Sequence, residues 1–134
     1  MKKKLLFTTL FILFLACFTA CGSNSLPQGA NIFNDKLDSV QKINIILPDV
    51  KTIDNKEDVK QICDIILNQT YSEMNNPPLI EGCFILELVG DENIEIGLIS
   101  NRLSINDKVY EARDKEAFTT IYNLFRESSR RNFS

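Results

Sequence analysis

The sequence predicts an α+β fold, a two-layer sandwich in which two helices cover one face of a mainly antiparallel sheet. Three observations support this prediction. Several short segments alternate apolar and polar residues, two segments repeat apolar residues at i, i+3, i+4 and i+7, and turn-forming residues separate the segments. The predicted element order is β-β-α-β-β-β-β-α. The chain has 134 residues, of which 44% are hydrophobic and 25% are charged, as is typical of one small globular domain.

The first half of the domain is predicted to contain two strands and a helix. Ile43, Ile45 and Leu47 alternate with Lys42, Asn44 and Ile46, which indicates a half-buried strand that ends at Pro48. A second strand follows at residues 50–53. We expect Asp54 to cap the next helix, with Glu57 three positions later in a capping-box arrangement. The apolar residues of this helix form one core-facing stripe: Val59, Ile62, Cys63 and Ile66.

A long loop and a hairpin are predicted next. Residues 68–81 have neither strand nor helix periodicity and contain two prolines, which favours a loop. Residues 83–89 and 94–99 are predicted strands that pair as a hairpin. In this pairing the apolar side chains of both strands share the core face, whereas Glu87 and Glu95 share the outward face.

A second hairpin and a helix complete the predicted domain. Strands at residues 102–105 and 108–111 are joined by Asn106-Asp107, a dipeptide that tolerates positive φ in a tight turn. We expect Asp114 to cap the last helix. Its apolar residues have helical spacing: Phe118, Ile121, Tyr122 and Phe125. The polar tail at residues 128–134 is expected to fray.

The first twenty residues have the pattern of a secretory signal. Lysines at positions 2–4 precede an apolar run over residues 5–20, which is shorter than the ~20 apolar residues of a spanning helix. The sequence Phe18-Thr19-Ala20-Cys21-Gly22-Ser23 resembles the lipobox of bacterial lipoproteins. The resemblance implies cleavage before Cys21 and a thioether-linked diacylglycerol on this cysteine. Cys17 and an uncleaved N-terminal membrane helix are the alternatives, and the length of the apolar run favours Cys21.

This interpretation divides the chain into four parts: a signal peptide at residues 1–20, the lipidated cysteine with a flexible tether at 21–39, an α+β globular domain at 40–127 and a frayed tail at 128–134. The tether is predicted because its residues are mostly polar or turn-forming. Docking of Ile32 and Phe33 on the domain is the alternative. Acyl chains on Cys21 are expected to attach the protein to the cell membrane, outside the cytoplasm.

Composition and charge exclude several function classes. The chain has no His, which excludes mechanisms that need imidazole, His-ligated zinc and haem on a proximal His. Without residues 1–20, 12 basic and 18 acidic side chains remain, a formal charge of −6. Such an acidic body repels phosphate groups, so no nucleic-acid partner is expected. We also expect no cofactor and no metal.

Three stretches of the mature chain carry a resemblance to a family: residues 43–46 (Ile-Asn-Ile-Ile), 54–59 (Asp-Asn-Lys-Glu-Asp-Val) and 103–110 (Leu-Ser-Ile-Asn-Asp-Lys-Val-Tyr). The chain resembles the small lipoproteins of low-GC Gram-positive bacteria that carry one short domain of unknown function after the lipidated cysteine. These stretches are patterns of strands and turns, so the resemblance implies no catalytic residue.

Two cysteines, Cys63 and Cys83, remain after processing, and outside the cytoplasm they are candidates for a disulfide. Strand parity places Cys83 on the outward face with Glu87, whereas Cys63 belongs to the inward stripe of its helix. Two separate free thiols are therefore the favoured alternative. Without His, two sulfur atoms leave a metal site incomplete.

Two further groups are candidate sites. Glu87, Asp91, Glu92 and Glu95 surround one hairpin, and paired carboxylates can perform acid–base catalysis or bind Ca²⁺. A solvated strand face explains them better, because a hairpin offers no desolvated setting to separate their pKa values. The long loop is a candidate binding loop, with a plain crossover as the alternative. Its candidate residues are Tyr71, Met74, Asn75, Asn76, Pro77 and Pro78.

The sequence contains no motif that identifies a substrate or a reaction. We expect a non-catalytic, lipid-anchored envelope protein whose domain binds another protein or a cell-wall component. Two alternatives stay open. One is an immunity-like or inhibitory surface lipoprotein, and the other is a small hydrolase that uses Glu87 and Glu95.

Overall fold

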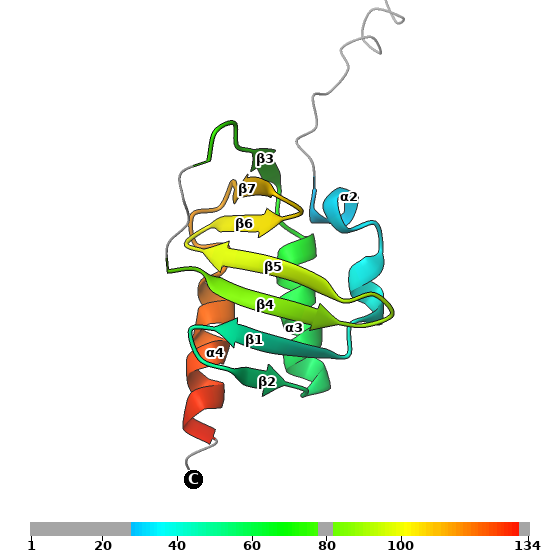
Figure 1. The fold of residues 1–134 in the computed structure, drawn as a ribbon, viewed down its shortest axis with the longest axis vertical. Coiled ribbons are helices and arrows are strands. Elements are labelled where there is room, and N and C mark those ends of the chain that lie inside the picture. The colour runs from blue at the N-terminus through cyan, green and yellow to red at the C-terminus, as the bar shows by residue number, and fades with distance from the viewer. Residues whose placement is uncertain (1–27, 78–81, 132–134) are drawn as a thin grey trace, which may run out of the picture.

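The computed structural model describes residues 28–77 and 82–131. In these residues seven antiparallel strands form one sheet with the order β2-β1-β4-β5-β6-β7-β3. Helices α3 and α4 lie behind one face of this sheet, and the opposite face, called the open face below, is turned toward the viewer in Figure 1. The predicted α+β class with a mainly antiparallel sheet is confirmed.

The elements follow one another along the chain as α2 (Gly29–Phe33), the 3-10 helix η1 (Lys36–Ser39), β1 (Lys42–Leu47), β2 (Lys51–Ile53), α3 (Lys56–Leu67), β3 (Tyr71–Glu73), β4 (Phe84–Val89), β5 (Ile94–Ile99), β6 (Arg102–Ile105), β7 (Lys108–Ala112) and α4 (Thr119–Arg131).

Alternation along the strands builds the core between the sheet and the two long helices. In β4, Leu86 and Leu88 are fully buried, while Glu87 between them lies on the open face. Leu86 pairs with Ile96 of β5 and with Ile45 of β1, so apolar side chains continue across neighbouring strands. The predicted stripe of α3 completes this core with buried side chains at Val59, Ile62, Cys63 and Ile66. Of the stripe predicted for the last helix, Ile121 and Phe125 are buried in α4, Phe118 is buried in the turn before α4, and Tyr122 is half-buried at the edge of the core.

Residues 29–39 are folded, which corrects the predicted tether. Phe33 of α2 and Leu37 of η1 are 1% and 3% exposed and belong to the core. Gly29 permits this packing, because a Cβ at this position would lie 2.4 Å from the backbone oxygen of Ile66 in α3. The tether prediction is therefore wrong for residues 28–39. The docking alternative is right for both of its residues, because Phe33 is buried in the core and Ile32 is partly buried against it. Residues 1–27, with Cys17, Cys21 and the predicted signal peptide, lie outside the described residues.

A strand that the sequence did not predict lies inside the long loop. Residues 71–73 form β3, which pairs with β7 at the edge of the sheet. Tyr71 is fully buried and its hydroxyl donates a hydrogen bond of 2.7 Å to the backbone oxygen of Ile66. This one anchoring side chain fixes a strand that is too short to give a periodic pattern.

The N-cap of α3 is Asn55, one position later than predicted. Its side-chain oxygen accepts hydrogen bonds from the backbone N–H groups of Glu57 and Asp58, at 2.9 and 3.2 Å. The predicted capping box of Asp54 and Glu57 is therefore wrong. The helix and its direction are unchanged, because Asn is as good an N-cap as Asp.

The last helix begins and ends later than predicted. Asp114 accepts a hydrogen bond of 2.9 Å from the backbone N–H of Glu116 in a turn that precedes α4, so it caps this turn and not the helix. The helix runs from Thr119 to Arg131. The prediction that the chain frays from residue 128 is therefore wrong for residues 128–131, which are helical. Residues 132–134 lie outside the described part of the chain.

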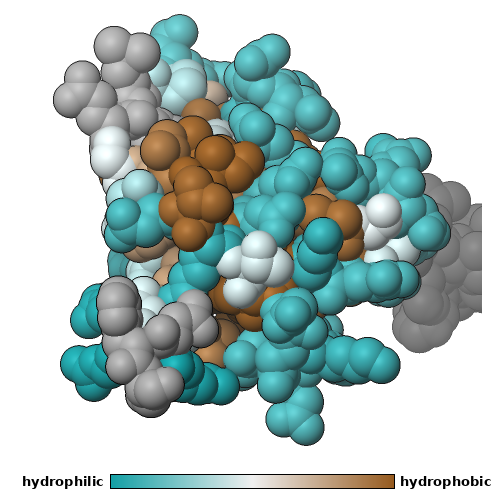
Figure 2. Space-filling view, turned by 60° about the horizontal axis from the view of Figure 1, so that its bottom comes forward, coloured by the Kyte–Doolittle hydropathy of each residue, from teal (hydrophilic) through white to brown (hydrophobic). Residues whose placement is uncertain are grey.

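None of the helices in the described ranges is long and apolar enough to cross a membrane. Among the residues that the structure describes, the large hydrophobic side chains that remain exposed belong to the end of β1 and the β1–β2 turn: Ile46, Leu47 and Val50. Figure 2 shows hydrophobic surface interrupted by polar side chains on the side of the molecule that carries this turn.

Candidate functional site

The two thiols are free and lie on different sides of the sheet. Cys63 faces the core from α3, and burial raises the pKa of its thiol from 9.0 to about 11. Cys83 is half-buried and precedes β4 on the open face. The disulfide is therefore not formed, as strand parity favoured.

The structure divides the predicted binding loop. Tyr71 is a core residue, so its predicted role as a ligand contact is wrong. Met74 is half-buried, and its backbone N–H donates to the backbone oxygen of Val109 at 2.8 Å. Asn75, Asn76 and Pro77 are exposed, and Pro78 lies outside the described residues.

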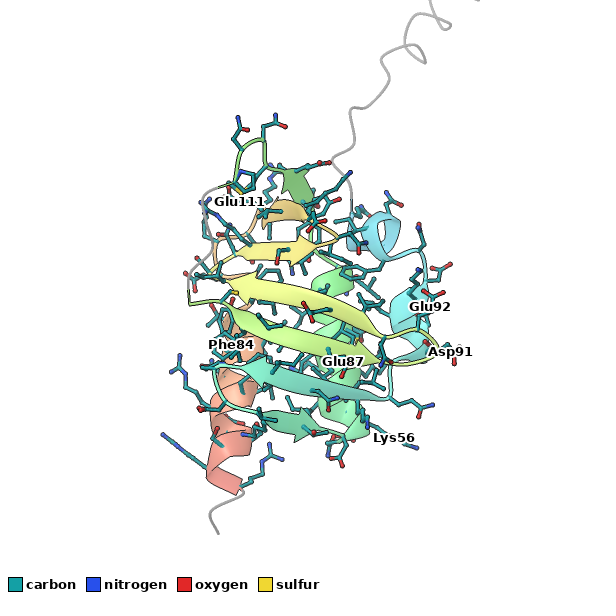
Figure 3. All side chains as sticks on the ribbon, in the orientation of Figure 1. Lys56, Phe84, Glu87, Asp91, Glu92 and Glu111 are labelled. Carbon is teal, nitrogen blue, oxygen red and sulfur yellow. The ribbon has the colours of Figure 1, made fainter. Side chains whose placement is uncertain are left out.

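The carboxylate of Glu87 lies in the middle of the open face (Figure 3). Its two oxygens accept hydrogen bonds from the side-chain amides of Asn44 and Asn93, at 2.8 and 3.2 Å. Glu95 is its cross-strand partner on β5. Because the two amides hold Glu87 in a polar network along the strands, the arrangement favours a structural role for this carboxylate.

Asp91 and Glu92 project from the β4–β5 turn, at a distance along the sheet from Glu87 (Figure 3). Glu92 is engaged with Lys36 of η1 at 2.6 Å. Across the described ranges, no group of three or more Cys, Asp or Glu side chains is placed to hold a metal ion.

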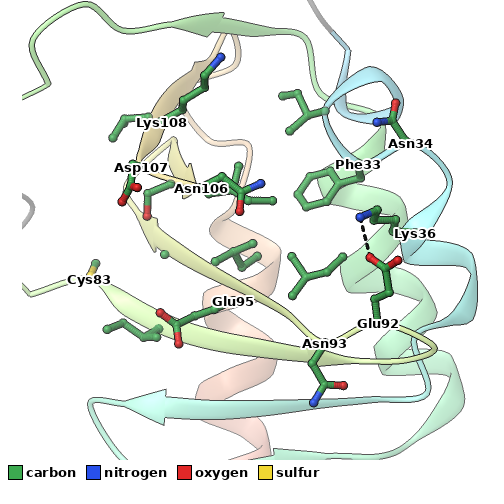
Figure 4. Close-up of a pocket in the computed structure, with 18 residues that line it drawn as sticks. Phe33, Asn34, Lys36, Cys83, Glu92, Asn93, Glu95, Asn106, Asp107 and Lys108 are labelled. Carbon is green, nitrogen blue, oxygen red and sulfur yellow. Dashed lines mark hydrogen bonds and ion pairs between the residues drawn. The ribbon is translucent and has the colours of Figure 1, made fainter.

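A groove of about 750 Å³ lies between β5 and the β6–β7 hairpin. Figure 4 shows Glu95 on one side of this groove, Asn106 and Asp107 on the other, and Phe33 and Lys36 toward its α2 end. On the core side, Ile96 and Ile105 line it with buried side chains. The groove thus combines an apolar floor with polar rims.

The strand β5 leaves part of its edge without a partner in this groove. It pairs with β4 over residues 94–98 but with β6 only over residues 97–99, and the two strands then diverge (Figure 1). The β5–β6 turn has two residues, Ser100 and Asn101. The pair that closes such a turn, here Ile99 and Arg102, exchanges backbone hydrogen bonds. Every second residue along β5 points its backbone N–H and C=O toward the same side, so Gly97 and Glu95 point theirs in the same direction as Ile99. For Glu95 this direction is the groove. Within the described residues no strand pairs with Glu95 on that side, and the residue is exposed.

Gly97 lies at the end of the groove where β5 and β6 are paired. A Cβ at Gly97 would lie 2.4 Å from the hydroxyl oxygen of Ser104 and 3.8 Å from the sulfur of Cys83. Side chains from both neighbouring segments therefore approach the position from two sides. Because Gly97 has no side chain, the side chain of Ser104 in the paired strand β6 can pack over β5 here.

The unpaired charges at the rims of the groove are negative. Lys36 is paired with Glu92, and Lys108 lies 3.6 Å from Glu73. In the part of the chain that the structure describes, Glu95 and Asp107 have no ion-pair partner. The groove therefore presents two carboxylates to a ligand.

The sequence analysis missed this site, although one signal was present. The predicted strand at 94–99 is two residues longer than its partner at 102–105, so its first residues have no counterpart in the hairpin. No feature of the sequence indicated that α2 lines one end of the groove. Compared with protein-family models, curated proteins and solved structures, the chain has no significant match.

Proposed function

We propose that this chain is a lipid-anchored, non-catalytic binding module of the cell envelope, which holds an extended polypeptide segment of a partner protein in the groove beside β5. The observation that carries the proposal is the unpartnered backbone of Glu95 in an open groove. A strand edge with free N–H and C=O groups is a template for a further strand. Strand addition of this kind uses backbone hydrogen bonds for affinity and pockets for alternate side chains for specificity.

The surroundings of Glu95 support a polypeptide as the ligand. A strand added opposite Glu95 would exchange backbone hydrogen bonds with this residue, and the side chains on either side of the bonded residue would point toward the core side of the groove, which Phe33 and Ile105 line with largely buried side chains.

The two alternatives differ in their support. An inhibitor or immunity-like protein is a special case of the proposed module, because it also holds a protein partner. A hydrolase that uses Glu87 and Glu95 has less support, since two side-chain amides already engage the Glu87 carboxylate.

Short peptides test the groove. The full chain in detergent micelles is titrated with Ac-Thr-Val-Xaa-Val-Thr-NH₂, in which Xaa is lysine or norleucine, and amide chemical shifts are followed by NMR. We expect shifts at residues 94–97, with affinity about tenfold weaker when the central peptide nitrogen is methylated, because one or two hydrogen bonds are lost.

A matched pair of variants tests the same contact from the protein side. Glu95→Pro removes the groove-facing N–H and is expected to weaken binding of the norleucine peptide, whereas Glu95→Ala keeps the N–H and the binding. The thermal midpoint of Glu95→Pro checks that the chain is folded. Equal binding of the methylated and unmethylated peptides would exclude strand addition.

A further inference from the structure

The chemistry of the partner segment can be derived from the register of β5 and from the charges around Glu95. We infer that the groove selects an extended segment of the pattern apolar–basic–apolar, in which the lysine or arginine lies beside the carboxylate of Glu95. This inference rests on the proposed function. The inference has a steric part and an electrostatic part.

The steric part follows from strand alternation. Ile94 and Ile96, the neighbours of Glu95, point toward the core side of the sheet, where Ile96 is 1% exposed. A paired strand has the same alternation, so the residue opposite Glu95 lies on the open face and its two neighbours point toward the floor. The floor is formed there by Phe33 and Ile105, which are 1% and 8% exposed. Because this lining is apolar and leaves little exposed surface, small apolar side chains suit the two flanking positions better than polar ones.

The electrostatic part concerns the central residue. Side chains directly opposite each other in a strand pair lie on one face and interact, and opposite charges stabilise such a pair. The partner's central side chain therefore lies beside Glu95, which has no ion-pair partner within the described residues. On the opposite rim, Asp107 is exposed at the tip of the hairpin and is likewise unpaired there (Figure 4).

The basic residues around the groove do not neutralise the negative charge of Glu95 and Asp107. Lys36 lies 2.6 Å from Glu92, and Lys108 lies 3.6 Å from Glu73, so both ammonium groups are already beside a carboxylate. A cation that enters between Glu95 and Asp107 consequently meets two carboxylates that have no ion-pair partner among the described residues. An acidic residue at the same position meets repulsion.

The peptide series Ac-Thr-Val-Xaa-Val-Thr-NH₂ separates charge from backbone pairing, with Xaa as lysine, norleucine or glutamate. Lysine and norleucine have similar apolar stems and differ in charge. At low ionic strength we expect the lysine peptide to bind the full chain about threefold to fivefold more tightly than the norleucine peptide, and the glutamate peptide to bind most weakly. The preference for lysine should shrink in about 1 M salt, which screens exposed charges beyond ~3 Å.

Variants assign this preference to a residue. Glu95→Gln should remove most of the preference for lysine, and Glu95→Lys should reverse it in favour of the glutamate peptide. Glu57→Gln, at the exposed first turn of α3, changes the net charge of the chain by the same amount as Glu95→Gln but outside the groove, and should leave the preference unchanged. Retention of the lysine preference in Glu95→Lys would overturn the assignment.

The outcomes separate this inference from the proposed function. Equal binding of all three peptides at residues 94–97, lost on methylation of the central nitrogen, overturns the charge selection and leaves strand addition in place. Absence of binding by every peptide overturns both. A lysine preference that disappears in Glu95→Gln supports both.

Discussion

At the scale of single residues, two acidic groups of the core make stability depend on pH. Tyr71 is fully buried, and burial raises the pKa of its phenol well above the ordinary value of 10.0. Burial likewise raises the pKa of the Cys63 thiol from 9.0 to about 11. In both cases the folded chain keeps a proton that the unfolded chain loses first.

The free energy of unfolding is therefore expected to fall as pH rises above about 9. Between the unfolded and folded pKa values the unfolded chain binds fewer protons, so each group contributes a slope of up to about 1.4 kcal/mol per pH unit. Urea unfolding between pH 7 and pH 10.5 measures this slope. The double variant Cys63→Ala, Tyr71→Phe should show a smaller slope, whatever its stability at pH 7. An unchanged slope in the double variant would contradict the prediction.

At the scale of elements, the long periodic segments were predictable and the short ones were not. The hairpin of β4 and β5 and the stripe of α3 repeat their pattern often enough to identify the face of each residue. α2 has five residues and β3 has three, which is too few for a period to appear. Their positions depend on tertiary contacts of Phe33 and Tyr71 with α3 and the sheet. The groove was missed for the same reason, because α2 closes one of its ends.

The docking of α2 on α3 depends on one glycine. Gly29→Ala would place a Cβ 2.4 Å from the Ile66 oxygen and 2.7 Å from the Leu67 Cα, which are backbone atoms that cannot rotate away. We expect a loss of about 1–3 kcal/mol in the free energy of unfolding, because α2 must shift. The shift moves Phe33, so the affinity for the lysine peptide should also fall.

Ala30→Ser is the matched control for this change, because Ala30 is exposed on the same short helix. Its effect on stability should stay within about 0.5 kcal/mol. Urea unfolding and peptide titration of both variants give the comparison. Equal stability of Gly29→Ala and the original chain would show that α2 does not depend on the close contact.

At the scale of the whole molecule, the position of α2 relates the groove to the proposed membrane anchor. The described part of the chain begins at Gln28, only seven positions after Cys21. Seven residues span at most ~25 Å, so an acylated Cys21 keeps the start of α2 within that distance of the bilayer. The groove adjoins α2, whereas the end of α4 lies at the opposite end of the molecule (Figure 1). A partner segment would thus be bound close to the membrane surface.

The anchor itself is tested by two cysteine substitutions. We expect the protein from membranes of a bacterial host to lack residues 1–20 and to carry the added mass of a diacylglycerol on Cys21, and intact-mass analysis measures both. Cys21→Ala removes the sulfur that accepts the lipid, so the variant should keep its leader and its unmodified mass. Cys17→Ala, four positions earlier in the apolar run, should be processed like the original chain. Retention of Met1 in the original chain, or a block in processing by Cys17→Ala instead of Cys21→Ala, would remove Cys21 as the anchor and with it the position of the groove beside the bilayer.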